Sequence, residues 1–352
     1  MSASVEHSVE TVAASRPRFA RELETLALRL PPGKKLGAVL AVARASNGDL
    51  FVFQQPNAQG TDPASMALPC WLPPIVHLTG DGEFINAWGG PDHIPAVDGV
   101  SQWPVGPEGL ECDAEGNLWV FGWLSGDAAV LKFSPSGELL LRIGQRGRAG
   151  DDRDTQYLDR PTSCYHDIQT REVFVADGYG NHRVIAFNSD TGAFTRMWGC
   201  HGKDPYSLSP EEGFVIVHKV ARGPNGRLYV ADRTQCRVQE FELVPGGARF
   251  TREVTIAPGT MVFHTGSAWD ISFAPGDRFM YVADGSNFRI WIVDLNGFKV
   301  LGSTTVHTEY ENEINLPLHY NLVHRFAVEP SGDLLLACVN AGLKRLKFQG
   351  IR

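Results

Sequence analysis

The stretch that decides the fold spans residues 214–241 and reads FVIVHKVARGPNGRLYVADRTQCRVQEF. Two strand-like runs, HKVARG and RLYVAD, are joined by a Pro-Asn-Gly turn, and a third run, RVQEF, follows a short polar turn. Apolar and β-branched residues separated by turns of this chemistry are typical of an antiparallel meander. The segment therefore predicts most of one four-stranded sheet.

The same pattern recurs along the whole chain at intervals of about 55 residues. Related segments begin at Val39, Glu108, Thr162, Trp269 and His324. Six copies of a meander with this period predict an all-β, six-bladed β-propeller, in which each repeat forms one blade.

The repeats leave little of the 352 residues outside a single domain. We expect residues 1–17 to be a flexible N-terminal tail and residues 18–352 to form the propeller. Residues 18–30 (RFARELETLALRL) suit a helix or an edge strand, and we expect them to pair near the C-terminal LKRLKFQ and close the ring. An insertion at residues 57–74 is either a lid over one face or a plain surface excursion.

Composition narrows the classes of partner and the compartment. The net charge is −8 without a long basic run, which argues against a nucleic-acid partner. No apolar stretch approaches the roughly 20 residues that span a bilayer, so no membrane association is expected. The N-terminus lacks the apolar region of a signal peptide, and the six cysteines show no CxxC spacing. These features predict reduced thiols and a cytoplasmic location.

Aligning the repeats on their turns reveals a column of equivalent positions at the start of each innermost strand. From blade one to blade six these are Leu40, Glu108, Thr162, His218, Trp269 and His324. Alternate blades are about 120° apart in a six-bladed ring, so side chains from blades two, four and six can converge on the axis. Two imidazoles and a carboxylate are a common ligand set for a divalent metal, with zinc expected first and iron or manganese as alternatives. The simpler interpretation is that these histidines only form hydrogen bonds in a wet channel.

Several motifs carry a resemblance to a known family. The segments FVADGYGNHRVIAF, VHKVARGPNGRLYVADRTQCRVQEF and LVHRFAVEPSG resemble NHL-repeat propellers, and in particular the catalytic core of peptidyl-alpha-hydroxyglycine alpha-amidating lyase. That family holds zinc with three histidines from alternate blades. The resemblance implies that His218 and His324 match the second and third, and that Glu108 replaces the first. It also implies that Tyr179 matches the active-site tyrosine and that Arg233 matches an arginine near the substrate.

The sequence also departs from that family. Gln55 stands at the position of the presumed catalytic arginine base, and glutamine cannot accept a proton in that role. Arg325 replaces an aspartate that binds a structural calcium, so its charge can stand in for that cation. The two family disulfides fall at Asp159 with Gly180 and at Tyr229 with Glu240, where no cysteine is present. Amidation of secreted peptides is therefore not expected.

The function that these residues favour is a metal-dependent lyase or hydrolase acting on a small oxygenated molecule, aromatic or carboxylated. Tyr179 would move a proton and Arg233 would anchor an anion. A packed loop tyrosine and a salt bridge from Arg233 to Asp232 are the structural alternatives for these two residues.

Other residues and functions stay open at this stage. Trp123 and Trp269 suit an aromatic wall or simple core packing, and His264 could reach the same face. The repeated VAD motifs, which end at Asp177, Asp232 and Asp284, are interpreted as turn caps. The alternative functions are a non-catalytic NHL-propeller binding module for a protein or ligand, and a lactonase-type hydrolase.

Overall fold

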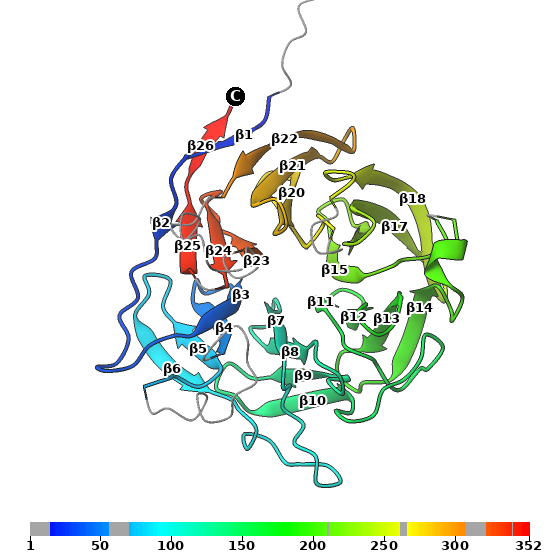
Figure 1. Ribbon diagram of the computed structural model, residues 1–352, viewed down its shortest axis with the longest axis horizontal. Coiled ribbons are helices and arrows are strands. Elements are labelled where there is room, and N and C mark those ends of the chain that lie inside the picture. The colour runs from blue at the N-terminus through cyan, green and yellow to red at the C-terminus, as the bar shows by residue number, and fades with distance from the viewer. Residues whose placement is uncertain (1–14, 56–69, 210, 261–265, 307–321, 340) are drawn as a thin grey trace, which may run out of the picture.

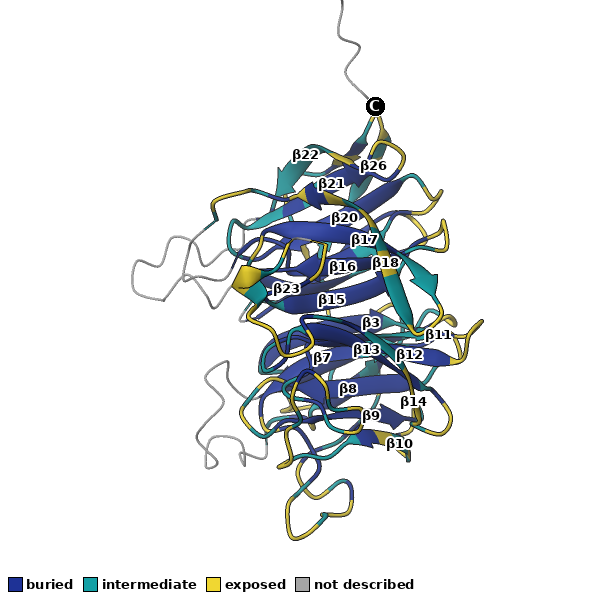
Figure 2. Cartoon of the chain, turned by 90° about the vertical axis from the view of Figure 1, so that its right-hand side faces the viewer, coloured by how far each residue is buried: buried dark blue, intermediate teal, exposed yellow. Residues whose placement is uncertain are grey.

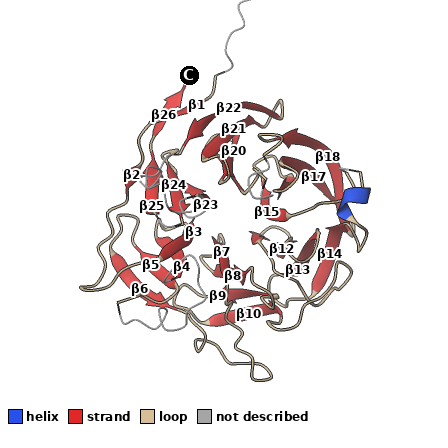
Figure 3. Cartoon of the chain, viewed as in Figure 1, coloured by secondary structure: helices blue, strands red, loops and turns tan. Residues whose placement is uncertain are grey.

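The protein is a ring of six antiparallel sheets around a central axis, as the view down that axis shows (Figure 1). This computed structural model describes residues 15–55, 70–209, 211–260, 266–306, 322–339 and 341–352. Within these ranges the regular structure is strand, apart from one short 3₁₀ helix, η1 Pro205–Ser207 (Figure 3). The predicted all-β, six-bladed propeller is confirmed.

Each blade runs from an inner strand at the axis to an outer strand at the rim. Blade one contains β3 Ala38–Arg44, β4 Leu50–Gln55, β5 Ile75–Leu78 and β6 Phe84–Trp88. Blade two contains β7 Pro107–Cys112, β8 Leu118–Gly122, β9 Ala129–Phe133 and β10 Leu139–Gly144. Blade three contains β11 Ser163–Asp167, β12 Glu172–Asp177, β13 Arg183–Asn188 and β14 Phe194–Gly199. Blade four contains β15 Val217–Arg222, β16 Leu228–Asp232, β17 Arg237–Val244 and β18 Gly247–Thr255. Blade five contains β19 Asp270–Phe273, β20 Phe279–Asp284, β21 Arg289–Asp294 and β22 Lys299–Thr305. Blade six contains β23 Val323–Val328, β24 Leu334–Cys338, β25 Gly342–Leu346 and β2 Glu24–Thr25.

The N-terminal segment closes the ring. Strand β2 pairs antiparallel with β25 and so supplies the outer strand of blade six. Strand β1 Pro17–Phe19 pairs with β26 Phe348–Ile351, and the buried Phe19 ring packs edge-on against Tyr281 of blade five. Residues 18–30 therefore contribute edge strands and not a helix.

The apolar core lies between neighbouring blades, where the middle strands are buried (Figure 2). One cluster joins Trp119 and Phe121 of blade two to Val175 and Ile185 of blade three. The turns that enter the second strands place Gly116, Gly226 and Gly332 at φ of 86°, 77° and 89°, a conformation that glycine adopts without strain. Each glycine follows a residue of the axial column, Glu108, His218 or His324, by eight positions, so the three turns keep these blades in the same register.

The VAD aspartates cap loops, as the sequence suggested. Asp232 accepts hydrogen bonds from the backbone N–H of Val215 and Ile216, and it forms a buried ion pair with Arg237 at 2.9 Å. Asp177 binds the N–H of Asp159 in the same way. These contacts fix the connections that lead to the inner strands.

The positions of the family's disulfides are neighbours in space but are linked differently. Tyr229 and Glu240 lie opposite each other in blade four, where the Tyr229 hydroxyl donates to Glu240 Oε2 at 2.6 Å. The N–H of Gly180 donates to the carbonyl of Asp159 at 3.0 Å. All six cysteines are free in the structure. None of the described helices is long and apolar enough to cross a membrane.

The insertion at residues 57–74 connects β4 to β5, the second and third strands of blade one. It does not lead from an outer strand to an inner one, as the connections before β7, β11 and β15 do. Residues 57–69 and His264 lie outside the described residues, and the lid stays a prediction.

We predict that ring closure by the N-terminal segment carries a measurable part of the stability. Deleting residues 1–25 removes Phe19 and exposes the edge of β25, so the free energy of unfolding should fall by at least about 3 kcal/mol. Denaturant titration measures this change, and size-exclusion chromatography should show association through the open edge. Deleting only residues 1–14 is the control, and equal stability of the two truncations would contradict the prediction.

Candidate metal centre at the propeller axis

The three predicted metal ligands stand at irregularities in their strands. The pairing register shifts between Pro107 and Gly109 in blade two, which places Glu108 at a β-bulge. The same shift occurs around His218 in β15 and around His324 in β23. A bulge breaks the alternation of side chains and re-aims them. These three residues consequently point at the axis.

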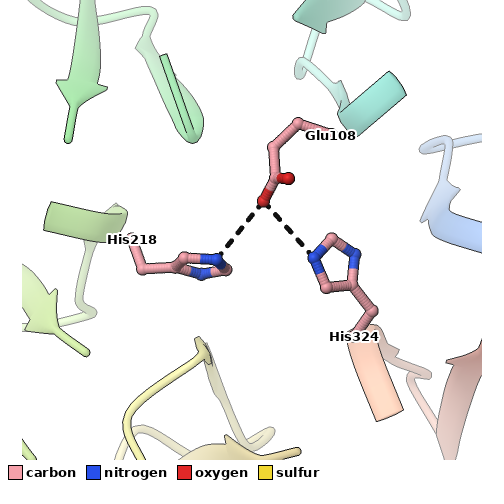
Figure 4. Close-up of side chains that lie close together, drawn as sticks. All are labelled: Glu108, His218 and His324. Atoms are coloured by element: carbon pink, nitrogen blue, oxygen red, sulfur yellow. Dashed lines mark ion pairs between the residues drawn. The ribbon is translucent and has the colours of Figure 1, made fainter. Parts of the chain in front are cut away.

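The side chains of Glu108, His218 and His324 meet at one point (Figure 4). Glu108 Oε1 lies 3.3 Å from His218 Nε2 and 3.3 Å from His324 Nε2. One potential ligand atom from each of the three lies within 4.8 Å of the others. All three residues are buried. The structure thus brings together the three residues that the sequence predicted, from blades two, four and six.

The other ring nitrogens fix how the histidines face this point. His218 Nδ1 lies 2.5 Å from the carbonyl oxygen of Trp269, and His324 Nδ1 lies 2.9 Å from that of Leu40. Because a carbonyl only accepts, each Nδ1 carries the proton. Each ring then directs its Nε2 at the Glu108 carboxylate, so that a cation bound between these atoms would meet all three side chains.

The charge states agree with this arrangement. Burial alone would raise the pKa of Glu108, but the adjacent His324 and His218 hold it well below the usual carboxyl range. Burial, together with the nearby cations Arg325 and Arg233, lowers the pKa of His218 well below its ordinary value. An ionised carboxylate and a neutral imidazole are the forms that bind a metal.

Tyr179 and Arg233 lie beside this centre. The Tyr179 hydroxyl is 3.0 Å from His218 Nε2, and Arg233 Nη1 donates to the hydroxyl oxygen at 2.8 Å. Burial raises the pKa of Tyr179 to about 12, so the phenol keeps its proton at neutral pH. The structure therefore places both predicted residues at the site, joined to each other.

Arg233 does not form the expected structural alternative, a salt bridge to Asp232, because Arg237 pairs with that carboxylate instead. Among the described residues no carboxylate lies within ion-pair distance of Arg233, and its Nε is buried without a partner. The guanidinium stacks over the rings of Trp269 and Tyr179, at 4.7 Å and 5.1 Å from their centroids. Trp123 is 44% exposed, and its ring centroid is 6.4 Å from that of Tyr179.

The sequence missed the part played by the remaining ring positions. Leu40 and Trp269 are poor ligands as side chains, yet their carbonyls orient the two histidines. Thr162 supplies a carbonyl to Arg325, which in turn binds Glu108. The type of a side chain carries no information about contacts made by its backbone carbonyl. The only available signal was that these three residues alternate with Glu108, His218 and His324 around the axis.

A second group of possible ligands, Asp113, Glu115 and His166, lies between blades two and three. The Asp113 carboxylate already accepts from the N–H groups of Glu115 and Asn117 and from Trp119 Nε1. Glu115 is exposed. This group is therefore a turn cap with a neighbouring histidine, and a single metal per chain is expected.

Comparison with known proteins supports the class of the protein. No protein-family model matches the chain. It is 33% identical over 190 residues to mouse peptidyl-glycine alpha-amidating monooxygenase, covering 52% of this chain and 17% of that protein. It is 28% identical over 226 residues to human NHL repeat-containing protein 3, covering 63% of this chain and 58% of that protein. The chain spans less than two thirds of the length of each of these relatives.

A third relative and a solved structure complete the comparison. The chain is 29% identical over 226 residues to peptidyl-alpha-hydroxyglycine alpha-amidating lyase 1 of Drosophila melanogaster, covering 59% of this chain and 38% of that protein. A streptogramin B lyase structure aligns with a TM-score of 0.56 at 11% identity, over 93% of this chain and 98% of that one, which shows the fold alone. The chain is a six-bladed propeller, and its sequence resembles NHL-repeat proteins. Within that class it resembles the amidating lyase core.

We predict that the three converging side chains hold one metal ion. Protein purified without added metal should contain close to one equivalent by elemental mass spectrometry, and His218→Ala or His324→Ala should lose most of it while keeping the wild-type circular dichroism. Glu108→Gln should weaken binding because it deletes the anionic ligand. Glu108→His should retain metal, since it offers a third imidazole.

The matched control is His182→Ala, because His182 Nδ1 also contacts a carbonyl, that of Val215, at 2.7 Å but lies off the ring. This variant should keep its metal. Stoichiometric metal in both ring variants would disprove the site.

Proposed function

We propose that this protein is a metal-dependent lyase or hydrolase that acts at the propeller axis on a small oxygenated, anionic or aromatic substrate. The observation that carries the proposal is the convergence of two Nε2 atoms on the buried Glu108 carboxylate. A binding scaffold has no need of two imidazoles and a carboxylate from alternate blades, whereas these are a common ligand set for a divalent metal.

Zinc is the expected ion for this donor set, and iron or manganese are alternatives. A divalent ion there would supply Lewis acidity toward a hydroxyl or carbonyl oxygen. Glu108 and the two histidines would hold it, with the carbonyls of Leu40 and Trp269 keeping both rings in place. The channel residues thus contribute orientation as well as ligands.

Tyr179 is the residue suited to proton transfer. Its phenol is protonated at neutral pH, it lies at hydrogen-bond distance from a ligand nitrogen, and Arg233 steadies its oxygen. When His218 Nε2 is engaged by a cation, the hydroxyl proton is free to turn toward a substrate oxygen or leaving group. Gln55, in the place of the family's presumed base, cannot replace it in this role.

Arg233 defines the class of substrate. A buried guanidinium with an unpaired Nε and no carboxylate partner among the described residues favours an incoming anion. Because Nη1 already donates to Tyr179 and the guanidinium lies near the rings of Tyr179 and Trp269, Nε remains as a donor for a carboxylate. The half-exposed Trp123 adds an apolar surface for an aromatic group.

Turnover with and without metal tests this function. An aromatic N-acyl-α-hydroxyglycine is the first probe, because it combines a hydroxyl, a carboxylate and a ring. We expect chelation to abolish its conversion and one equivalent of zinc, iron(II) or manganese to restore it. Full conversion by the metal-free protein would disprove the mechanism. Probe binding without conversion in either state would favour the binding module.

We predict that Tyr179→Phe separates chemistry from metal binding. Loss of the phenolic proton should lower kcat by about 10²–10⁴, whereas metal content should stay at the wild-type value because no ligand is removed. Tyr165→Phe is the matched control, since Tyr165 lines the opposite mouth of the channel. A wild-type kcat for Tyr179→Phe would exclude it from proton transfer.

A further inference from the structure

A layer of buried charged side chains crosses the channel directly beneath the ligands. Arg325 Nη2 donates to Glu108 Oε1 at 3.1 Å and to the carbonyl of Thr162 at 2.5 Å. Its Nη1 donates to the carbonyl of His218 at 3.3 Å and lies 3.5 Å from Asp270 Oδ1. The side chain is only 4% exposed, so these contacts replace water almost completely.

A second cation completes the layer. Lys219 Nζ lies 3.5 Å from Asp270 Oδ1 and forms an ion pair with Glu111. Beyond this layer the channel opens into a cavity of about 850 Å³, lined by residues at the far ends of the inner strands, such as Arg44 and Arg222. The charged layer therefore separates the ligand ring from the opposite mouth.

The bulges explain how this layer is built. Because the register shifts at His324, the next residue, Arg325, also reaches the axis, and Lys219 does so after His218. The irregularities at His218 and His324 thus each provide one candidate ligand and one cation from consecutive residues. A regular strand would send the second side chain into the space between the blades.

The contacts of Arg325 are those of a bound ion. It lies on blade six and touches Glu108 of blade two, the Thr162 carbonyl that precedes β11 in blade three, His218 of blade four and Asp270 of blade five. Two carboxylates and two main-chain carbonyls are the oxygen donors that a hard cation takes. Burial would lower the pKa of Arg325, but Asp270 and Glu108 raise it, so the guanidinium stays charged.

We propose that Arg325 is a positioning residue, a built-in cation that holds the Glu108 carboxylate under the two histidines and joins five blades at the axis. The ligand set then stands assembled before any metal arrives. This inference rests on the proposed metal centre for its effect on affinity. The contribution of Arg325 to the stability of the contacts around the axis does not depend on a metal.

The experiment compares Arg325→Met with Arg183→Met. Arg183 is an equally buried arginine that pairs with Asp177 at 2.9 Å and donates to the carbonyls of Asp154 and Tyr157, away from the ring. Both variants should unfold at lower temperature than the wild type when metal-free. Only Arg325→Met should lose affinity for zinc and cobalt(II), by about 10–100-fold in a competition titration. Arg325→Lys should recover part of this loss because it restores the charge without the planar contacts.

Chemical rescue extends the test to Arg325→Ala. Guanidinium chloride at millimolar concentration should raise its melting temperature and metal affinity, whereas urea, which is planar but uncharged, should not. Wild-type metal affinity in Arg325→Met, or an equal loss in Arg183→Met, would overturn the inference. If the wild type binds no metal, the proposed function fails, and the inference is then decided by guanidinium rescue of the melting temperature alone.

Discussion

The axial structure depends on one buried carboxylate. Glu108 is 3% exposed, and an ion removed from water to this degree is strongly destabilising unless opposite charge surrounds it. Arg325 meets this requirement from one side, and the Nε2 atoms of the two histidines face the carboxylate from the other. The inner strands therefore cannot separate without exposing a charge that five blades help to neutralise. The same contacts that close the channel also position the ligands.

The backbone register determines how the negative charge of Glu108 is neutralised. Propeller blades bring the starts of their inner strands to one axis, but a regular strand offers only every second side chain to the channel. The shifts around His218 and His324 let two consecutive residues face inward. One level of the channel then consists of donor atoms, and the next consists of ion pairs. In these two strands, a candidate metal ligand is followed directly by a residue of the ion-pair layer.

The repeats were sufficient to predict the six blades, the closing role of residues 18–30 and the convergence of Glu108, His218 and His324, because turn chemistry and period are local properties of a sequence. The resemblance suggested that Arg325 stands in for a cation, but the contacts of the layer formed by Lys219, Asp270 and Arg325 were not predictable. A bulge leaves no signature in the residue pattern, so the inward direction of Arg325 appears only in the pairing register. That Arg233 has no carboxylate partner in the described part of the chain was equally hidden, since it depends on which arginine Asp232 binds.

The two departures from the amidating lyase ligand set are in contact with each other. Where the lyases that this chain resembles have a histidine and, after the third histidine, an aspartate, this chain has Glu108 and Arg325, whose side chains are 3.1 Å apart. The first replacement adds a negative charge to the ring and the second adds a positive one below it, so each compensates the other. Either residue alone would lack one of its charged partners at a buried position, which is destabilising. A ligand set of altered charge also changes the acidity of whatever it binds. The loss of an arginine at Gln55 is consistent with such a change, since a centre with different acidity does not require the same base.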